Sequence, residues 1–143
     1  MVRSRLSSPL MGVHESRLRV RYGETDQGGV VYHANYLAYF EQGRTEWLRD
    51  HDIVYRDLEA GGARLAVVRS EVRHHRPAMY DQVLQVATRL VSLGPARIRF
   101  AYEIRSDETD EVLCSGTTEL ACLDNKGQPR RLPSALGAIL ADT

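Results

Sequence analysis

The sequence carries no excess of charge of either sign and only one lysine. Nineteen basic residues balance nineteen acidic ones, and every basic residue except Lys126 is an arginine. A chain without net charge has no overall field to attract nucleic acid or an anionic membrane surface. Its apolar runs also stay far below the roughly 18 residues needed to cross a bilayer. We therefore expect neither nucleic-acid binding nor membrane insertion.

Signatures of several catalytic centres are missing as well. The sequence contains no Cys-x-x-Cys pair, no His-Glu-x-x-His helix, no Gly-x-Ser-x-Gly elbow and no Gly-x-Gly-x-x-Gly phosphate loop. The adjacent His74 and His75 would point to opposite faces of a strand. We expect no metal site and no cofactor.

Cysteine is scarce, and its placement indicates free thiols. Cys114 and Cys122 lie eight positions apart in one predicted strand, on the same face but too far apart to form a disulfide. Buried free thiols suit a reducing compartment, so we expect a cytoplasmic protein. Residues 1–16 lack a continuous apolar core and are expected to form a lead-in rather than a signal peptide or anchor. Residues 17–143 are long enough for one domain.

Apolar periodicity predicts one long helix and five strands. Helical spacing runs over 36–50, and a shorter helix over 53–60 is closed by Gly61-Gly62. Alternation predicts strands at 17–22, 65–75, 83–93, 97–105 and 112–123, followed by a C-terminal helix from Pro133. Strands joined by tight connections pair antiparallel. The predicted fold class is therefore α+β, an antiparallel sheet with a helix against one face.

Candidate catalytic residues lie just before the long predicted helix. Residues 22–36 read Tyr-Gly-Glu-Thr-Asp-Gln-Gly-Gly-Val-Val-Tyr-His-Ala-Asn-Tyr. Asp26 precedes the flexible pair Gly28-Gly29, and Asn35 is expected to cap the helix. Unpaired N–H groups at a helix N-terminus can hold an oxygen that becomes negative during a reaction. Asp26 could then act as base or nucleophile. An aspartate in such a loop also commonly caps a turn, so the residues alone leave both interpretations open.

The order and spacing of these residues resemble the signature of the 4-hydroxybenzoyl-CoA thioesterase family of hot-dog proteins, especially the acyl-CoA thioesterase branch found beside the Tol-Pal system. The matching positions are Tyr22, Thr25-Asp26, 28–33, Asn35-Tyr36 and Arg44, and more weakly 76–78 and 80–81. This resemblance implies a hot-dog fold, in which a five-stranded antiparallel sheet wraps around one long central helix. It also implies that Asp26 is the catalytic carboxylate and that the backbone N–H of His33 polarises the thioester carbonyl.

The resemblance further implies a substrate, a set of binding residues and an assembly. The substrate would be an acyl-CoA or acyl-carrier-protein thioester, with coenzyme A as part of the substrate, and the assembly a homodimer or homotetramer with its site at an interface. The expected substrate-binding residues are Tyr22, Gly28, Gly29, Val30, Tyr36, Phe40 and Val68. Candidate cations for the coenzyme A phosphates are Arg73, Arg97 and Arg99, for which an ordinary solvated surface is an equally good explanation.

Two other functions stay open at this point. A hot-dog hydratase or dehydratase would need a histidine and an acid on opposite sides of the acyl chain, and His33 with Glu41 is the available pair. A non-catalytic module that binds acyl-CoA or an acyl carrier would use the same fold. The sequence does not specify the acyl group.

Overall fold

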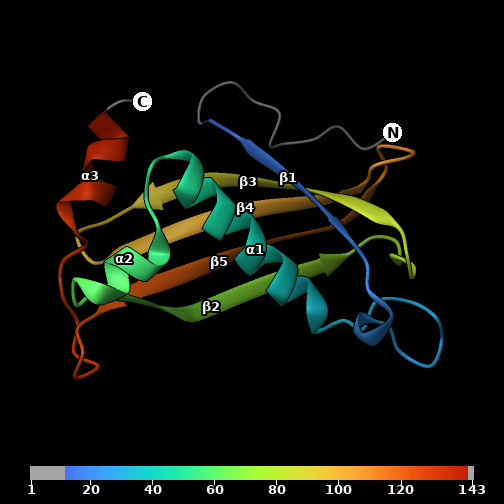
Figure 1. Ribbon diagram of the computed structural model, residues 1–143, viewed down its shortest axis with the longest axis horizontal. Helices are drawn as coiled ribbons and strands as arrows, with labels where there is room; N and C mark the ends of the chain where they lie inside the picture. Colours follow the sequence, from blue (N-terminus) through green and yellow to red (C-terminus); the bar gives the residue numbers. More distant parts are fainter. Residues whose placement is uncertain (1–11, 142–143) are drawn as a thin grey trace.

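The computed structural model describes residues 12–141 (Figure 1). Its strands are β1 (His14–Arg19), β2 (Arg64–His74), β3 (Val83–Leu93), β4 (Arg97–Ser106) and β5 (Val112–Leu123). Its helices are α1 (Asn35–Asp50), α2 (Tyr55–Ala60) and α3 (Ser134–Ala141), with a short 3-10 turn at Tyr22–Glu24. Expectations for residues 1–11 and 142–143 lie outside the described residues.

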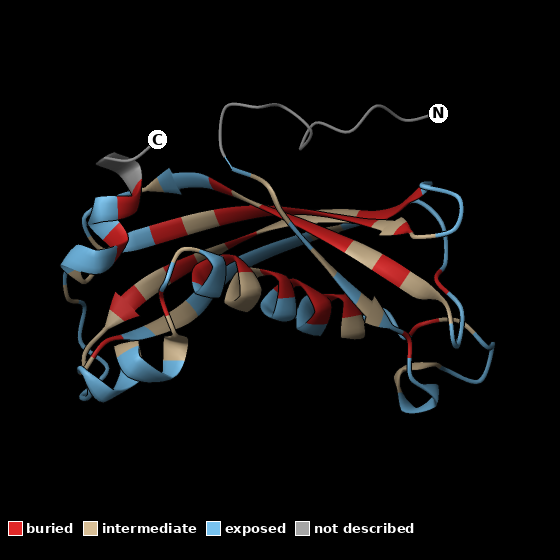
Figure 2. Cartoon of the chain, turned by 45° about the horizontal axis from the view of Figure 1, so that its top comes forward, coloured by how far each residue is buried: buried red, intermediate tan, exposed pale blue. Residues whose placement is uncertain are grey.

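The strands form one antiparallel sheet in the order β1-β3-β4-β5-β2. Helix α1 lies along one face of this sheet, and Figure 2 shows the strands curving over its buried side. Sequential strands β3, β4 and β5 are neighbours because each is joined to the next by a tight turn. The architecture confirms the predicted five-stranded antiparallel sheet around one long helix.

The core lies between α1 and the inner face of the sheet. The buried residues of α1 are Tyr36, Tyr39, Phe40, Gly43, Trp47 and Leu48. Strand β4 supplies four side chains at most 2% exposed, as its alternation predicts: Ile98, Phe100, Tyr102 and Ile104. Phe40 stacks on Tyr102 with ring centroids 4.3 Å apart. Each large apolar side chain buried in this way contributes about 1.5–3 kcal/mol to folding.

Helix α1 begins at Asn35, and Asn35 does not cap it. The N-cap position is Ala34, which has no side-chain capping bond. The Asn35 side chain instead donates from Nδ2 to the backbone oxygen of Glu24 at 2.7 Å. The predicted asparagine cap is therefore wrong, because this side chain meets an acceptor eleven residues earlier in the chain.

Two side chains of α1 lie differently from their expected places, and β1 starts early. Leu37 belongs to the predicted apolar stripe, yet it is 39% exposed. Helical spacing predicts that Arg44 faces outward or toward a partner, and in this chain only 13% of its side chain is exposed. Strand β1 begins at His14, so residues 14–16 belong to the sheet and not to a lead-in that ends at residue 16.

A β-bulge at Val68 changes which residues of β2 share a face. Pairing passes from Val67 opposite Leu120 to Arg69 opposite Glu119, so Val68 is the extra residue. Paired residues point to the same side of an antiparallel sheet, so Val67 shares the inward side of the buried Leu120. Strict alternation predicted one face made of Ala66, Val68, Ser70 and Val72. That assignment is wrong because the bulge shifts the alternation by one residue.

Replacing Gly43 with alanine should destabilise the fold. A Cβ at this position would lie 2.5 Å from Thr88 Oγ1 and 2.8 Å from Val86 Cγ1. A close-packed interior relieves such an overlap only by moving the helix, so we expect urea denaturation to show a loss of about 1–3 kcal/mol. Gly137→Ala in α3 is the matched control, since its added Cβ meets nothing within 4 Å. A wild-type unfolding midpoint for Gly43→Ala would contradict this account of the packing.

Candidate active site

The segment between β1 and α1 forms a narrow loop that is closed at its base. Thr25 and Val31 make an isolated antiparallel bridge, and the Asp26 N–H donates to the Val30 oxygen at 2.8 Å. Val30 also bridges Met79 in the connection between β2 and β3. The loop is thus a small hairpin, attached to the rest of the chain on one side, with Asp26 at the start of its tip.

The carboxylate of Asp26 uses one oxygen to hold this loop. Oδ1 accepts hydrogen bonds from the Gly28 N–H at 2.8 Å and the Val30 N–H at 3.4 Å. Gly29 completes the turn at φ +81, a conformation that favours glycine. Within residues 12–141, Oδ2 accepts no hydrogen bond, and Asp26 is exposed. Asp26 therefore does cap a turn, and the same geometry leaves its second oxygen available for chemistry.

The N-terminus of α1 follows directly from the loop and has free donors. Asn35 N–H donates to Tyr32 O at 2.9 Å, and Tyr36 N–H to His33 O at 3.4 Å. In the described part of the chain, the N–H groups of His33 and Ala34 donate to no acceptor. Unpaired N–H groups at a helix start are what an oxyanion needs. The His33 ring is exposed and lies 4.5 Å from the Tyr32 ring, centroid to centroid.

Glu24 joins the loop to the helix, a role that the sequence did not suggest. Its backbone oxygen accepts from Tyr32 N–H at 2.9 Å and from Asn35 Nδ2 at 2.7 Å. Its Oε1 accepts from Arg21 N–H at 2.8 Å and from the Tyr39 hydroxyl at 3.1 Å. One feature of the sequence could have pointed to this contact. The helical spacing of Tyr39 places its side chain on the inward face of α1.

Two of the expected substrate-binding residues are core residues in this chain. Tyr36 is 3% exposed, and its hydroxyl accepts from Ala78 N–H at 3.3 Å, while Phe40 is fully buried. Neither forms an open wall here. Tyr22 is 77% exposed and packs edge-on against Tyr80, and Val68 is 49% exposed on β2.

The three arginines expected to bind phosphate do not form a cluster. Arg73 is in register with Ser115 on β5, which is in turn in register with Glu103 on β4. Arg97 lies six residues before Glu103, about 20 Å along the strand. Moreover, β2 and β4 are separated by β5 and are not neighbours in the sheet. The nearest acidic partners are Glu71 for Arg73, at 3.2 Å, and Glu119 for Arg97, at 2.8 Å. Arg99 lies opposite Glu119 on the neighbouring strand.

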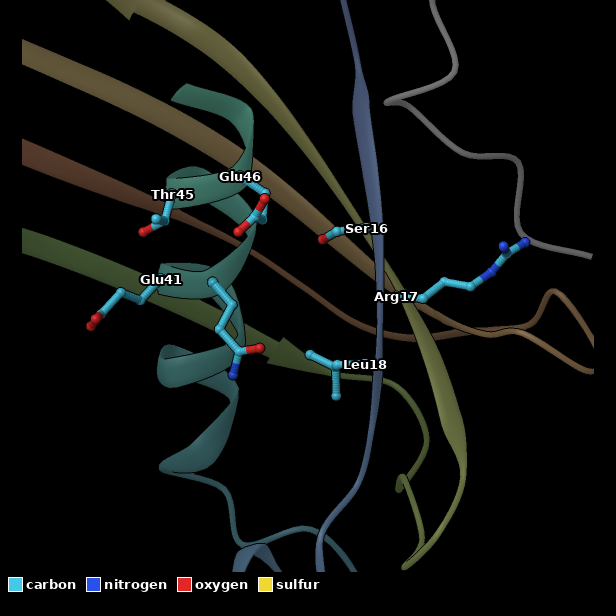
Figure 3. A pocket seen from close by; sticks show the side chains of 7 residues that line it. Ser16, Arg17, Leu18, Glu41, Thr45 and Glu46 are labelled. Carbon is cyan, nitrogen blue, oxygen red and sulfur yellow. The ribbon is translucent and has the colours of Figure 1, made fainter. Parts of the chain in front are cut away.

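The hollows described on this chain lie away from Asp26. One of about 500 Å³ runs between β1 and α1, where Ser16 and Leu18 turn toward the helix and Arg17 points away (Figure 3). A second, of about 560 Å³, lies between residues 76–82 and 106–113. A third, of about 170 Å³, lies beside Arg44. None of these three hollows is lined by Asp26.

Other chemistries find little support in the described residues. Residues 12–141 contain no group of three or more His, Cys, Asp or Glu placed to hold a metal ion. In the same range, no helix is long and apolar enough to span a membrane. Burial raises the pKa of the Cys114 thiol to about 12, so it stays protonated and is a poor nucleophile.

Comparison with known proteins assigns the family. The family profile described as thioesterase-like superfamily matches residues 20–140. The chain belongs to this superfamily. It is similar to the acyl-CoA thioester hydrolase YbgC of Escherichia coli O6:H1, with 35% identity over 85% of this chain and 90% of that protein.

Solved structures of similar proteins have the same fold. The DHNA-CoA thioesterase of Staphylococcus aureus is 28% identical, with a TM-score of 0.84 and coverage of 90% of this chain and 91% of that one. The hypothetical protein TT1821 of Thermus thermophilus is 30% identical, with a TM-score of 0.85 and coverage of 92% and 97%. These findings confirm the hot-dog resemblance and the enzyme class of a thioester hydrolase, and they do not favour the hydratase.

Replacing Gly28 with alanine should slow thioester hydrolysis. An added Cβ would lie 3.2 Å from Asp26 Oδ1, so the carboxylate has to move by a few tenths of an ångström. We expect kcat to fall about tenfold, because small displacements of a reacting group cost much of its alignment. Gly23→Ala is the control, since its Cβ meets nothing within 4 Å. Equal kcat values for the two variants would show that the loop tolerates the displacement.

Proposed function

We propose that this protein hydrolyses an acyl-CoA thioester to a free acid and coenzyme A, with Asp26 as base or nucleophile and the start of α1 as the oxyanion site. One observation carries the proposal. Within residues 12–141, the segment from Asp26 to Ala34 bears both a carboxylate oxygen that accepts no hydrogen bond, on Asp26, and two N–H groups that donate to no acceptor, on His33 and Ala34. An acid beside unpaired donors is the pairing that acyl transfer requires.

Two routes use the same groups. In the first, Asp26 takes a proton from water while the water oxygen attacks the thioester carbon, and His33 N–H stabilises the oxyanion. The tetrahedral intermediate then breaks its C–S bond, and the proton on Asp26 passes to the departing thiolate. In the second, Asp26 Oδ2 attacks the carbon and expels the thiolate, and water hydrolyses the resulting anhydride.

The finer substrate assignment is also a proposal. Coenzyme A is favoured over an acyl carrier protein as the thiol because the similar E. coli protein is named an acyl-CoA thioester hydrolase. Of the three arginines, Arg73 is kept as a candidate for the phosphates, since it adjoins His74, whose ring lies 5.3 Å from that of Tyr36 in the first turn of α1. The two buried free thiols fit a cytoplasmic location.

A second copy of the chain would complete the site. Strand β2 forms an edge of the sheet and carries two exposed apolar residues, Val67 at 48% and Val68 at 49%. A long apolar edge strand is normally paired or covered. Because β2 ends at His74 beside Tyr36, a partner paired along it would cover the mouth of the loop that holds Asp26. We propose a homodimer joined along β2, and dimers that pair again into tetramers are compatible with it.

Asp26→Asn should abolish turnover while leaving substrate binding intact. The amide keeps the size of the side chain and an oxygen for the Gly28 and Val30 N–H groups, but it cannot act as base or nucleophile. We expect kcat to fall by about 10³-fold or more, measured by thiol release from acetyl-, butyryl-, benzoyl- and 1,4-dihydroxy-2-naphthoyl-CoA. Asp26→Glu should fail similarly, since it moves the carboxylate by about an ångström.

Near-normal turnover by Asp26→Asn would overturn the catalytic assignment and bring forward a different base. If the wild-type protein binds these thioesters without releasing thiol, the non-catalytic binding module is the better function. Single-turnover hydrolysis in heavy-oxygen water separates the two routes. Label in the Asp26 side chain indicates the anhydride, and label only in the product acid favours direct attack by water.

Val68→Lys should convert the assembly to monomers and lower activity with it. The substitution places a charge in the exposed middle of the β2 edge, where a paired strand would have to bury it. Sedimentation velocity at micromolar concentration is the measurement. Val91→Lys is the control, because Val91 is 39% exposed on β3, away from that edge, and should leave the mass unchanged. A wild-type protein that sediments as an active monomer would defeat the dimer proposal.

A further inference from the structure

Four hydrogen bonds converge on Glu24, and they come from three different places in the chain. Arg21 N–H approaches from the end of the β1 segment and Tyr32 N–H from the returning arm of the loop. Asn35 and Tyr39 approach from the first and second turns of α1. Because these donors belong to separate segments, Glu24 fixes where the loop sits relative to the helix.

The contact with Tyr39 is the deepest of the four. Tyr39 is fully buried, so its hydroxyl needs an acceptor inside the protein, and Glu24 Oε1 is that acceptor at 3.1 Å. Burial, together with the neighbouring Glu24 carboxylate, raises the pKa of the Tyr39 hydroxyl, which therefore keeps its proton and donates it. An ionised acceptor makes this hydrogen bond stronger than one between neutral groups.

Along the chain, this junction adjoins the proposed reacting groups on both arms of the loop. Glu24 lies two residues before Asp26 and immediately before the bridge between Thr25 and Val31. On the other arm, Tyr32 comes immediately before His33, whose N–H is the proposed oxyanion donor. A shift of Glu24 would therefore move the carboxylate and the donor relative to each other.

The other side of the loop is held separately. Val31 N–H donates to the Ala78 oxygen at 2.8 Å, and Ala78 N–H donates to the Tyr36 hydroxyl. With Glu24 altered, the loop would keep this attachment through Ala78. The expected damage is thus a misalignment of Asp26, with the loop still folded.

We infer that Glu24, held by Tyr39 and Asn35, is a positioning residue that sets the distance between the Asp26 carboxylate and the N-terminus of α1. Glu24 is half-buried at the base of the loop, where its Oε1 accepts from Arg21 and Tyr39, whereas Asp26 is exposed at the start of the tip. The inference rests on the proposed function, in which Asp26 is the reacting group.

Conservative and disruptive variants of Glu24 and Tyr39 together test the inference that Glu24 is a positioning residue. Both hydrogen bonds of the carboxylate go to Oε1, so Glu24→Gln can replace them with its amide oxygen and should keep kcat within about threefold of wild type. Glu24→Ala and Tyr39→Phe each remove the contact with Tyr39 and should lower kcat by about 10- to 100-fold with little change in KM. If Glu24→Ala does not fold, Tyr39→Phe still tests the loss of this contact. Controls are Tyr55→Phe, whose hydroxyl bonds Leu65 in a different part of the fold, and the surface variant Glu46→Ala.

The effect must also depend on Asp26. In an Asp26→Asn background, Tyr39→Phe should cost no further turnover, because a positioning residue acts only through the group it positions. Three outcomes overturn the inference while Asp26→Asn stays inactive: wild-type kcat in Glu24→Ala and Tyr39→Phe, a Glu24→Gln loss as large as that of Glu24→Ala, or an undiminished loss in the Asp26→Asn background. An active Asp26→Asn variant would instead overturn the proposed function and this inference with it.

Discussion

The close approach of α1 to the inner face of the sheet is the constraint on which the remaining structure depends. Gly43 lets the helix lie against Val86 and Thr88, and Gly116 leaves room for the Phe40 ring. At this distance the aromatic side chains of the helix pack against the inner face of the sheet, where Phe40 stacks on Tyr102. The position of the helix axis is set by this packing, and the position of the helix N-terminus follows from it.

The candidate active site is built from local hydrogen bonds at that N-terminus. The glycines after Asp26 let the chain turn back so that two N–H groups reach one carboxylate oxygen. The next residues enter α1 without a side-chain cap, which leaves donors for a ligand in place of an internal acceptor. Glu24 then ties the two arms of this arrangement to the buried face of the helix.

Besides packing against α1, the sheet provides an edge strand, β2, and the candidate site lies at the end of this strand. Strand β2 carries exposed valines and finishes beside the first turn of α1. The bulge at Val68 disturbs the inward and outward alternation there, so the edge presents apolar side chains that a regular strand would have divided between two faces. A surface of this kind suits a partner strand.

Periodicity in the sequence was sufficient for the elements and the fold class, because burial imposes a spacing of two on strands and 3.6 on helices. Strands β3 and β5 begin and end where the sequence predicts, and Asp26 with its glycines could be recognised by order and spacing. Tertiary structure decided the rest. The Asn35 side chain bonds a loop oxygen instead of capping, the Arg44 side chain is only 13% exposed, and Arg73 of β2 lies far from Arg97 of β4. In each case the deciding neighbour is distant in the chain, and one-dimensional spacing carries no information about it.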